Sequence, residues 1–385
     1  MSKRWGWAVA WMVVVLPVSV SAKSARHASP SVSRATVSSE PFSSAILVEA
    51  ESGSVLFEKN PHRQAPPASM TKMMLMLLVA EGVRDGRLHW DDPVRVSERA
   101  SKIGGSQVYL KSGEVFPLAE MMQAVVIHSA NDAAYAVAEM VAGSAAEFVA
   151  RMNERAVQLG MHDTKYQSVH GLPPEAGKLP DLSSASDLAV LARQLVGFPD
   201  ILRWSSTKEA TFRNGSMVLT NTNRLVRETD WIDGLKTGSY HEAGFNVTAT
   251  GHRDGMRLIA VVMGVPRKED CFSAAEDLLS NGFAEYHAVA PVHEGDVVAN
   301  DVAVKGGRPR FVRVVAGRSL TILSKRGKNP RFTLQLTIPR EVEAPLAARQ
   351  VVGEVVVHEG DNIVGTVPAV AADNVEVGSL WDRVF

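Results

Sequence analysis

The sequence predicts an α+β domain, with helices flanking an antiparallel sheet, followed by a small all-β domain. Strand-like runs lie near both ends of the first 286 residues, and helical runs fill the interval between them. Beyond about His287 only short β-type runs occur, separated by Gly, Pro and charged turns. The chain has 385 residues, which is enough for two or three domains of about 100–200 residues each.

The composition excludes several classes of protein. Lys and Arg total 41 against 42 Asp and Glu, and this balance argues against a nucleic-acid partner, which usually needs a basic face. The single cysteine, Cys271, excludes an intramolecular disulfide and provides no thiolate set for a zinc or iron–sulfur site. We therefore expect no metal and no cofactor.

Residues 1–22 have the pattern of a signal peptide. The basic pair Lys3-Arg4 precedes an apolar run at 5–18, and small residues before Lys23 form a cleavage site. The run is shorter than the ~20 residues of a membrane span. Residues 23–41 are rich in Ser, Ala and Arg, which is typical of a flexible linker. We therefore expect an exported protein.

The first domain is predicted to span residues 42–286. Alternating or continuous apolar runs beside turn residues predict its strands, at 45–48, 54–57, 245–250 and 258–263. Apolar residues at three- and four-residue spacing predict its helices, at 73–80, 118–127, 132–141, 146–159, 187–195 and 272–283.

The second domain is predicted to span residues 287–376. Its expected strands are 302–304, 311–315, 320–323, 332–338, 355–357 and 363–367. Residues 377–385 form a short tail whose apolar end is little longer than one helical turn. A segment that short buries too little apolar surface for firm anchoring, so we expect at most weak peripheral association with a membrane.

Several common signatures of hydrolases and nucleotide-binding proteins are absent from the sequence. There is no Gly-x-Ser-x-Gly elbow and no Gly-x-x-x-x-Gly-Lys phosphate loop. His241, His293 and His358 each precede a Glu, as in a zinc-protease helix, but no second His follows four positions later. We therefore interpret all three as surface pairs.

A Ser-x-x-Lys motif occurs in a context that suits a nucleophile. Ser69 and Lys72 follow two prolines and lead directly into an apolar helical run, so both lie at the start of a helix. Residues three apart share one helix face, which brings the Lys72 amine within reach of the Ser69 hydroxyl. The alternative for Ser69 alone is a helix cap. A second copy, Ser205 to Lys208, lacks the helical continuation, and we attribute it to chance.

Two further motifs follow in order along the chain. Ser129-Ala130-Asn131 lies between two helical runs, where a loop presents polar side chains to a cleft. Lys236-Thr237-Gly238 precedes an expected edge strand. Alone, each motif has an ordinary explanation: Ser129 could be a helix cap, and Lys236 could be a surface lysine at a turn. Together, the three motifs match the signature of β-lactamases and penicillin-binding proteins, with Ala in the variable place of the second motif.

On these motifs the chain resembles the low-molecular-weight penicillin-binding proteins, which are serine D-alanyl-D-alanine carboxypeptidases. The surrounding segments 67–74, 129–134, 169–172 and 233–238 also resemble this family. The resemblance extends from about Ala45 to Phe283, and the terminal β domain resembles the family's second domain. It implies the penicilloyl-serine transferase fold, also described as β-lactamase/transpeptidase-like. It also implies a location in the periplasm or on the outer face of the bacterial cytoplasmic membrane.

The resemblance also implies a chemistry for each residue. Ser69 would be the nucleophile and Lys72 the general base, since burial and the nearby Lys236 cation favour a neutral amine. Ser129 would relay a proton to the leaving amine, and Asn131 would hold the substrate amide.

The same resemblance implies a binding edge for the substrate, formed by the residues at and after the third motif. Thr237 and Gly238 would line it, with Thr237 helping to bind carboxylate. The backbone N–H groups of Ser69 and Ser239 would form the oxyanion hole.

One position departs from the family. The family commonly has an arginine after the last core strand that binds the terminal carboxylate, and the matching position here is Cys271. Arg267 and Lys268 lie a few residues earlier and are candidates to replace it, while the alternative is that they are solvated surface residues. We take Arg267 as the candidate substrate-binding residue.

The leading hypothesis is a D,D-carboxypeptidase that removes the terminal D-alanine from a peptidoglycan pentapeptide through an acyl-enzyme. We expect covalent inhibition by β-lactams. The departure at Cys271 leaves a D,D-endopeptidase of peptidoglycan cross-links open. A β-lactamase, which shares the nucleophile, and a non-enzymatic peptidoglycan-binding scaffold stay open as well.

Overall fold

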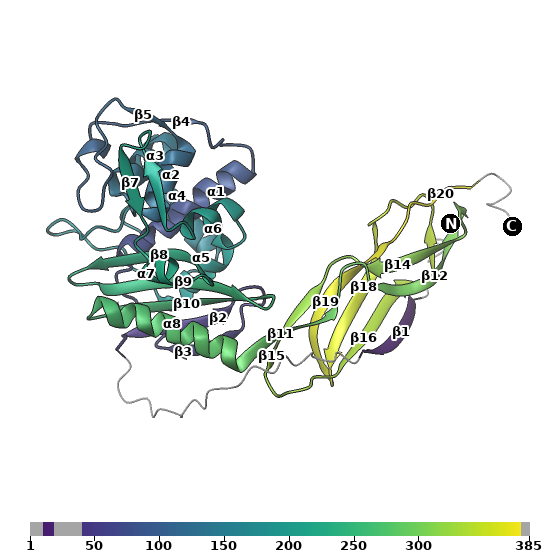
Figure 1. Ribbon diagram of the computed structural model, residues 1–385. Helices are drawn as coiled ribbons and strands as arrows, with labels where there is room; N and C mark the ends of the chain where they lie inside the picture. Colours follow the sequence, from purple (N-terminus) through teal and green to yellow (C-terminus); the bar gives the residue numbers. More distant parts are fainter. Residues whose placement is uncertain (1–10, 19–40, 379–385) are drawn as a thin grey trace, which may run out of the picture. The chain divides into compact units, whose positions relative to one another are not determined.

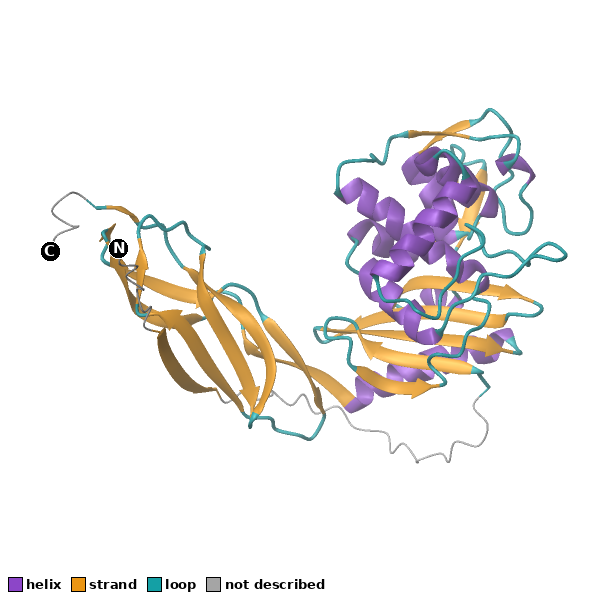
Figure 2. Cartoon of the chain, turned by 180° about the vertical axis from the view of Figure 1, so that it is seen from behind, coloured by secondary structure: helices purple, strands orange, loops and turns teal. Residues whose placement is uncertain are grey.

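The computed structural model describes residues 11–18 and 41–378, which form two compact units (Figure 1). One unit lies within Ser33–Glu285. The other comprises the residues from Tyr286 onward together with β1 (Trp11–Val18). The first unit contains helices and a sheet, and the second consists of strands (Figure 2). The predicted α+β class with an all-β carboxyl-terminal domain is confirmed.

An antiparallel sheet of five strands, in the order β3-β2-β10-β9-β8, forms the centre of the first unit. The strands are β2 (Ser44–Glu49), β3 (Val55–Lys59), β8 (Ile232–Tyr240), β9 (Gly244–Arg253) and β10 (Met256–Val265). Strand β2 pairs with β10, with Ala45 opposite Val262. The first strands of the unit therefore join its last ones, as the strand-like runs at both ends of the domain predict.

Both faces of this sheet are covered. Leu47 and Leu258 contact the helix α8 (Lys268–Glu285) at Gly282, whereas their neighbours Ile46 and Ile259 join the core shared with the other helices. Successive strand residues point to opposite faces, so the continuous apolar runs of β2 and β10 serve two cores at once. Figure 1 shows α8 along one face of the sheet and the helical lobe on the other.

Five helices of the lobe lie close to where the periodicity predicts them: α1 (Lys72–Arg84), α2 (Leu118–Ile127), α3 (Asn131–Ala142), α4 (Ala145–Gln158) and α5 (Ala185–Leu195). Two short helices, α6 (Pro199–Ser205) and α7 (Arg224–Glu228), were not predicted. In α1 every residue from Lys72 to Leu77 is fully buried, so this helix forms the centre of the lobe. Short elements that the sequence did not predict surround it: η1 (Ala68–Thr71), η2 (Ala100–Lys102), β4 (Pro93–Arg95), β5 (Val115–Pro117), β6 (Glu209–Phe212) and β7 (Met217–Thr220).

The second unit has a core of its own. Its main sheet has the order β1-β16-β18-β19-β14-β12-β17. The strands after β10 are β11 (Tyr286–Val292), β12 (Val297–Lys305), β13 (Gly307–Arg308), β14 (Phe311–Ala316), β15 (Leu320–Lys325), β16 (Phe332–Pro339), β17 (Glu341–Glu343), β18 (Val351–Glu359), β19 (Asn362–Ala371) and β20 (Glu376–Val377). In β16 alternate residues are buried, as expected for a strand with one face on a core.

Part of the expected signal peptide lies in the described residues. Strand β1 pairs antiparallel with β16, from Trp11 opposite Pro339 to Val18 opposite Phe332. The rest of that segment, the expected linker up to residue 40 and the tail after residue 378 lie outside the described residues. Cleavage of a signal peptide therefore stays a prediction. In the described part of the chain no single helix is long and apolar enough to cross a membrane, although α3 and α4 together, bent by 83°, have the length and composition to do so.

Candidate active site

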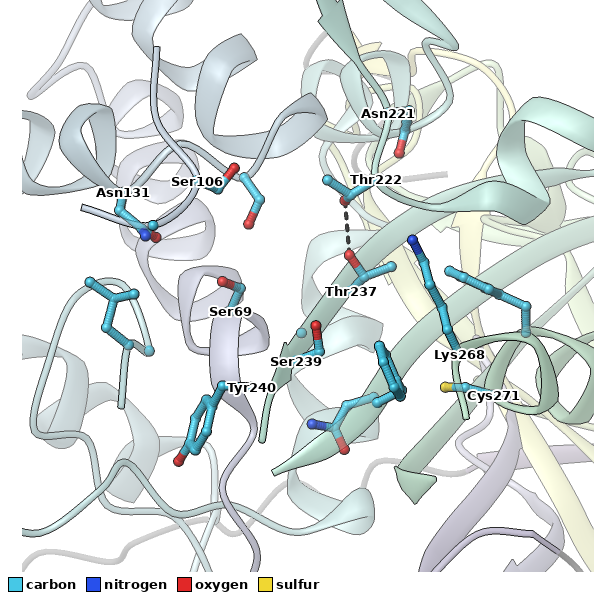
Figure 3. Close-up of a pocket in the computed structure, with 18 of the residues that line it drawn as sticks. Ser69, Ser106, Asn131, Asn221, Thr222, Thr237, Ser239, Tyr240, Lys268 and Cys271 are labelled. Atoms are coloured by element: carbon cyan, nitrogen blue, oxygen red, sulfur yellow. Dashed lines mark hydrogen bonds between the residues drawn. The ribbon is translucent and has the colours of Figure 1, made fainter. Parts of the chain in front are cut away.

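A cavity of about 400 Å³ in the first unit brings the three motifs together. Its lining includes Ser129 and Gly238 together with Ser69, Asn131, Thr237 and Ser239, and Figure 3 labels these last four. These residues come from η1, from the connection between α2 and α3, from the first residue of α3, and from the edge strand β8. The third motif therefore lies within the edge strand rather than before it, which corrects the placement expected from the sequence.

Ser69 and Lys72 are held in contact at the junction of η1 and α1. The Lys72 Nζ donates a hydrogen bond to Ser69 Oγ at 2.9 Å and another to the carbonyl oxygen of His170 at 2.7 Å. One helical turn separates the two residues, and this spacing directs both side chains to the same side. Ser69 borders the cavity, while Lys72 is completely buried beneath it.

Burial changes the acid–base behaviour of Lys72. The pKa of its amine is well below the usual value for lysine, chiefly because burial disfavours the ammonium form. The positive charge of Lys236 lowers this pKa further, while the carboxylates of Asp181 and Asp132 oppose the shift. A neutral amine beside the Ser69 hydroxyl is a competent proton acceptor.

Lys236 and Ser129 form a second contact of the same kind. The Lys236 Nζ donates to Ser129 Oγ at 2.9 Å and to the carbonyl oxygen of Thr237 at 3.1 Å. Burial lowers the pKa of Lys236 to about 7. Ser129 has φ of 65°, a left-handed conformation that serine seldom adopts, in the three-residue connection between α2 and α3. This tight connection points its hydroxyl toward Lys236.

Asn131 is the first residue of α3, and its side-chain amide is hydrogen-bonded through the nitrogen but not through the oxygen. Its backbone N–H donates to Ser106 O at 2.7 Å, and its Nδ2 donates to Gly104 O at 2.8 Å. Its Oδ1 has no hydrogen-bond partner among the described residues, although the side chain is 2% exposed and borders the cavity. The amide is therefore oriented by the protein and keeps an acceptor for an N–H group in the cavity.

Two glycines allow backbone segments to approach the nucleophile from either side. A Cβ at Gly238 would lie 2.9 Å from the Ser69 N and closer still to Pro67 O, so only glycine lets β8 lie against η1. Gly171 has φ of +76°, and a Cβ there would overlap Ala68 O and lie 3.1 Å from Ser69 N. The Ser69 turn is thus clamped between β8 and the segment that follows His170.

Asp181 holds this second segment in place. It accepts hydrogen bonds from Thr71 Oγ1 at 3.3 Å, from Ser168 N at 2.9 Å and from Ser168 Oγ at 2.7 Å. Ser168 Oγ in turn accepts the Gly171 N–H at 2.8 Å. Asp181 therefore connects the Ser-x-x-Lys motif, through Thr71, with the segment whose His170 carbonyl accepts from Lys72. A lone Asp in a Pro-rich loop gave no signal of this role in the sequence.

The wall beyond β8 contains residues that the sequence motifs did not include. Thr237 Oγ1 donates to Thr222 Oγ1 at 2.8 Å, shown as the dashed line in Figure 3. Asn221, Thr222 and Arg227 also line the cavity.

The start of α8 completes this wall. Lys268, Cys271 and Phe272 all line the cavity, because positions one helical turn apart share a face. Arg267 does not line it: its exposed guanidinium donates two hydrogen bonds to Asp270, at 2.7 and 2.9 Å. Burial raises the pKa of the Cys271 thiol to about 12, which keeps it protonated and a poor nucleophile.

The chain is similar to known proteins along most of its length. The family model described as D-alanyl-D-alanine carboxypeptidase matches residues 29–267, and the one described as penicillin-binding protein 5, C-terminal domain, matches residues 286–377. The D-alanyl-D-alanine carboxypeptidase DacF of Bacillus subtilis is 33% identical over 337 residues, which cover 86% of this chain and 85% of that protein.

Solved structures are similar as well. Penicillin-binding protein 5 from Haemophilus influenzae has 29% identity and a TM-score of 0.70, over 89% of this chain and 99% of that one. Penicillin-binding protein D2 from Listeria monocytogenes, solved in its ampicillin-bound form, has 30% identity and a TM-score of 0.58, over 63% and 98% of the two chains.

Proposed function

We propose, on the premise that this chain belongs to the D-alanyl-D-alanine carboxypeptidase family, that Ser69 is its nucleophile and Lys72 the base that activates it. The chain is a serine-type D,D-carboxypeptidase, a hydrolase that removes the terminal D-alanine of peptidoglycan stem peptides. The observation that carries the assignment of residues is the 2.9 Å contact between the Ser69 hydroxyl and the buried Lys72 amine.

Acylation begins with proton transfer from Ser69 to the neutral Lys72 amine. Ser69 Oγ attacks the carbonyl carbon between the two D-alanines, and negative charge develops on the carbonyl oxygen. The backbone N–H groups of Ser69 and Ser239 would stabilise this oxyanion. The contact of Gly238 with the Ser69 turn supports this assignment, since it holds β8 against the nucleophile.

Collapse of this intermediate breaks the bond between the carbonyl carbon and the leaving nitrogen. Ser129 would pass a proton to that nitrogen, since its hydroxyl accepts from Lys236, whose pKa of about 7 allows either protonation state near neutral pH. The released product is D-alanine, and water then hydrolyses the Ser69 ester.

Substrate binding is assigned to the remaining motif residues. The unpaired Oδ1 of Asn131 would accept the N–H of the penultimate residue. Gly238 and Ser239 would line the edge along which the peptide lies, and the Thr237 hydroxyl would help bind carboxylate.

The same nucleophile explains the expected inhibition. β-Lactams present a strained amide to Ser69 and leave a stable ester, and the ampicillin-bound relative supports this outcome. We also propose that the protein is exported to the periplasm or the outer face of the cytoplasmic membrane, where its peptidoglycan substrate lies. The signal-peptide pattern of residues 1–22 supports this location.

Mass spectrometry of the penicillin adduct, with D-alanine release measured alongside, tests this function. The wild type should gain one penicilloyl group on Ser69 and release D-alanine from a peptide ending in D-Ala-D-Ala. Ser69→Ala should lose both, while Ser206→Ala, from the second Ser-x-x-Lys segment, should retain both. Rapid penicillin turnover without a lasting adduct would instead identify a β-lactamase. Release from cross-linked peptides alone would identify an endopeptidase.

A further inference from the structure

We propose that Lys268 and Arg227 form the charged site that binds the terminal carboxylate of the substrate. This inference rests on the proposed function, because it assigns one end of the same peptide to one wall of the same cavity. It differs from the sequence prediction, which selected Arg267.

The charged side chains that line the cavity are all positive. Among the described residues that line it, Lys268 and Arg227 are cationic, and none is an aspartate, glutamate or histidine. The buried Lys236, whose amine donates to the Thr237 carbonyl oxygen, adds positive charge when it is protonated. A cavity with this lining attracts an anionic group, and the carboxylate of the terminal D-alanine is such a group.

Lys268 has no structural role that would explain its position. It is exposed, and it forms no ion pair or hydrogen bond with the described residues, unlike Arg267 beside it. It is also the first residue of α8, where a positive charge opposes the helix dipole. The acidic residues that suit this end of the helix, Glu269 and Asp270, follow immediately. A lysine at this position therefore slightly lowers the stability of the helix. A role in the cavity would explain why it is present.

The Lys268 side chain points toward the wall of the cavity that contains the Thr237 hydroxyl. Figure 3 shows its side chain extending from α8 toward Thr222 and Thr237, whose hydroxyls are hydrogen-bonded to each other. The Thr237 hydroxyl is in turn the group assigned above to carboxylate binding. An ammonium and two hydroxyls on one wall provide the donors that a carboxylate needs.

Arg227 adds the second cation on the same wall. It is exposed and has no ion-pair partner among the described residues. Its neighbour Arg224 differs in this respect, since it stacks on Phe272 and pairs with Glu228 at 3.3 Å. Arg224 is thus used to pack α7 against α8, and Arg227 remains available to the cavity.

Two matched substrates test the proposal. They are an acyl-D-Ala-D-Ala peptide with a free carboxylate and the same peptide with a terminal carboxamide. The wild type should prefer the free acid in kcat/KM. Lys268→Gln and Arg227→Gln should each reduce this preference by about two- to tenfold, mainly through KM, as expected for partly exposed charges. The double variant should lose most of the preference for the free acid. Increasing salt concentration should weaken the preference of the wild type.

The controls separate this site from general charge effects. Lys165→Gln removes an exposed lysine that does not line the cavity and should leave the ratio unchanged. The proposal fails if the wild type does not prefer the acid, or if Arg267→Gln lowers the preference and Lys268→Gln does not. Failure of the proposed function looks different, since D-alanine release would then survive in Ser69→Ala.

Discussion

Lys72 and Lys236 are 0% and 1% exposed, and neither forms an ion pair with a carboxylate among the described residues. Moving a charged ammonium group from water into the protein interior is unfavourable, so burial favours the neutral amine. The pKa of each lysine is therefore lowered, and the two positive charges reinforce the effect at Lys72. The roles proposed for these residues, a base at Lys72 and a proton relay through Lys236, both depend on these lowered pKa values.

The pH dependence of stability should reveal this cost. Lys236 has a pKa of about 7 when folded and about 10.4 when unfolded, so the unfolded chain binds more protons between these values. The free energy of unfolding of the first unit should therefore rise with pH from about 7 to about 10, by a few kcal/mol. Urea unfolding across this range checks the slope. Lys236→Met should flatten it, with a residual slope from Lys72, and an unchanged slope would contradict the assignment.

Asp181 should tune the activity of Lys72 without touching substrate. Its carboxylate raises the pKa of Lys72, so Asp181→Asn should lower that pKa and move the acidic limb of the kcat/KM profile to lower pH. The amide oxygen can still accept from the backbone N–H groups of Gln167 and Ser168, and the amide NH2 would then face the hydroxyl oxygens of Ser168 and Thr71, which can accept from it.

Asp187→Asn is the matched control for Asp181→Asn. Asp187 is also a buried acceptor, bonded to Thr164, but it exerts no charge effect on Lys72. Its variant should lose stability and keep the acidic limb in place. An equal shift in both variants would indicate a general structural effect.

At the scale of elements, the position of β8 against η1 depends on Gly238. Gly238→Ala should force the two apart and misplace Ser69 relative to Ser239. Overpacking costs about 1–3 kcal/mol, and a displacement of about 1 Å at a reacting group lowers the rate on the order of a hundredfold. The rate of acylation by a β-lactam, followed by stopped flow on folded protein, measures the effect.

Gly282→Ala provides the comparison for Gly238→Ala. Its Cβ would meet the side chains of Leu47 and Leu258 between α8 and the sheet, away from the nucleophile. It should lower stability by a similar amount and keep the acylation rate. Equal rates in the two variants would show that the approach of β8 to η1 does not set the position of Ser69.

The periodicity of the sequence was sufficient to predict most elements. The helix expected at 118–127 agrees with α2, and the strands expected at both ends of the first domain pair as β2 and β10. The third motif was placed before its strand, because Lys236-Thr237-Gly238 contains the small and polar residues of a turn. In the edge strand Thr237 and Gly238 line the cavity instead, and Lys236 is buried.

The residues of the cavity wall were less predictable because tertiary contacts select them. The apolar pattern starts the last helix at Phe272, whereas α8 begins at Lys268. The first turn of the helix therefore contains Lys268 and Cys271, which line the cavity, and Arg267 directly before it bonds to Asp270. Thr222 and Arg227 come from a loop and a short helix with no motif, so their sequence carries no sign that they lie beside β8.

At the scale of the whole molecule, two hydrophobic cores are separate. One involves the helical lobe and the five-stranded sheet, with members such as Met73 and Val261, and the other involves only the second unit, with members such as Leu336 and Val355. Units with separate cores generally unfold independently. We therefore expect two transitions in differential scanning calorimetry.

Acylation should identify which transition belongs to the first unit. A penicilloyl group on Ser69 makes contacts that exist only while that unit is folded, so it should raise one midpoint and leave the other in place. Ser69→Ala treated with penicillin should show no shift. A single transition that moves as a whole would show that the two units unfold together.

The glycine clamp around Ser69 also has a consequence for drug resistance. Gly171 and Gly238 leave no space for a side chain on either side of the nucleophile, so selection has few tolerated substitutions there. Arg227 and Lys268 are exposed and unpaired among the described residues, so the fold tolerates changes there. Because penicillin also carries a carboxylate, mutations on this rim should slow drug acylation, and by the assignment above they should weaken binding of the peptide as well.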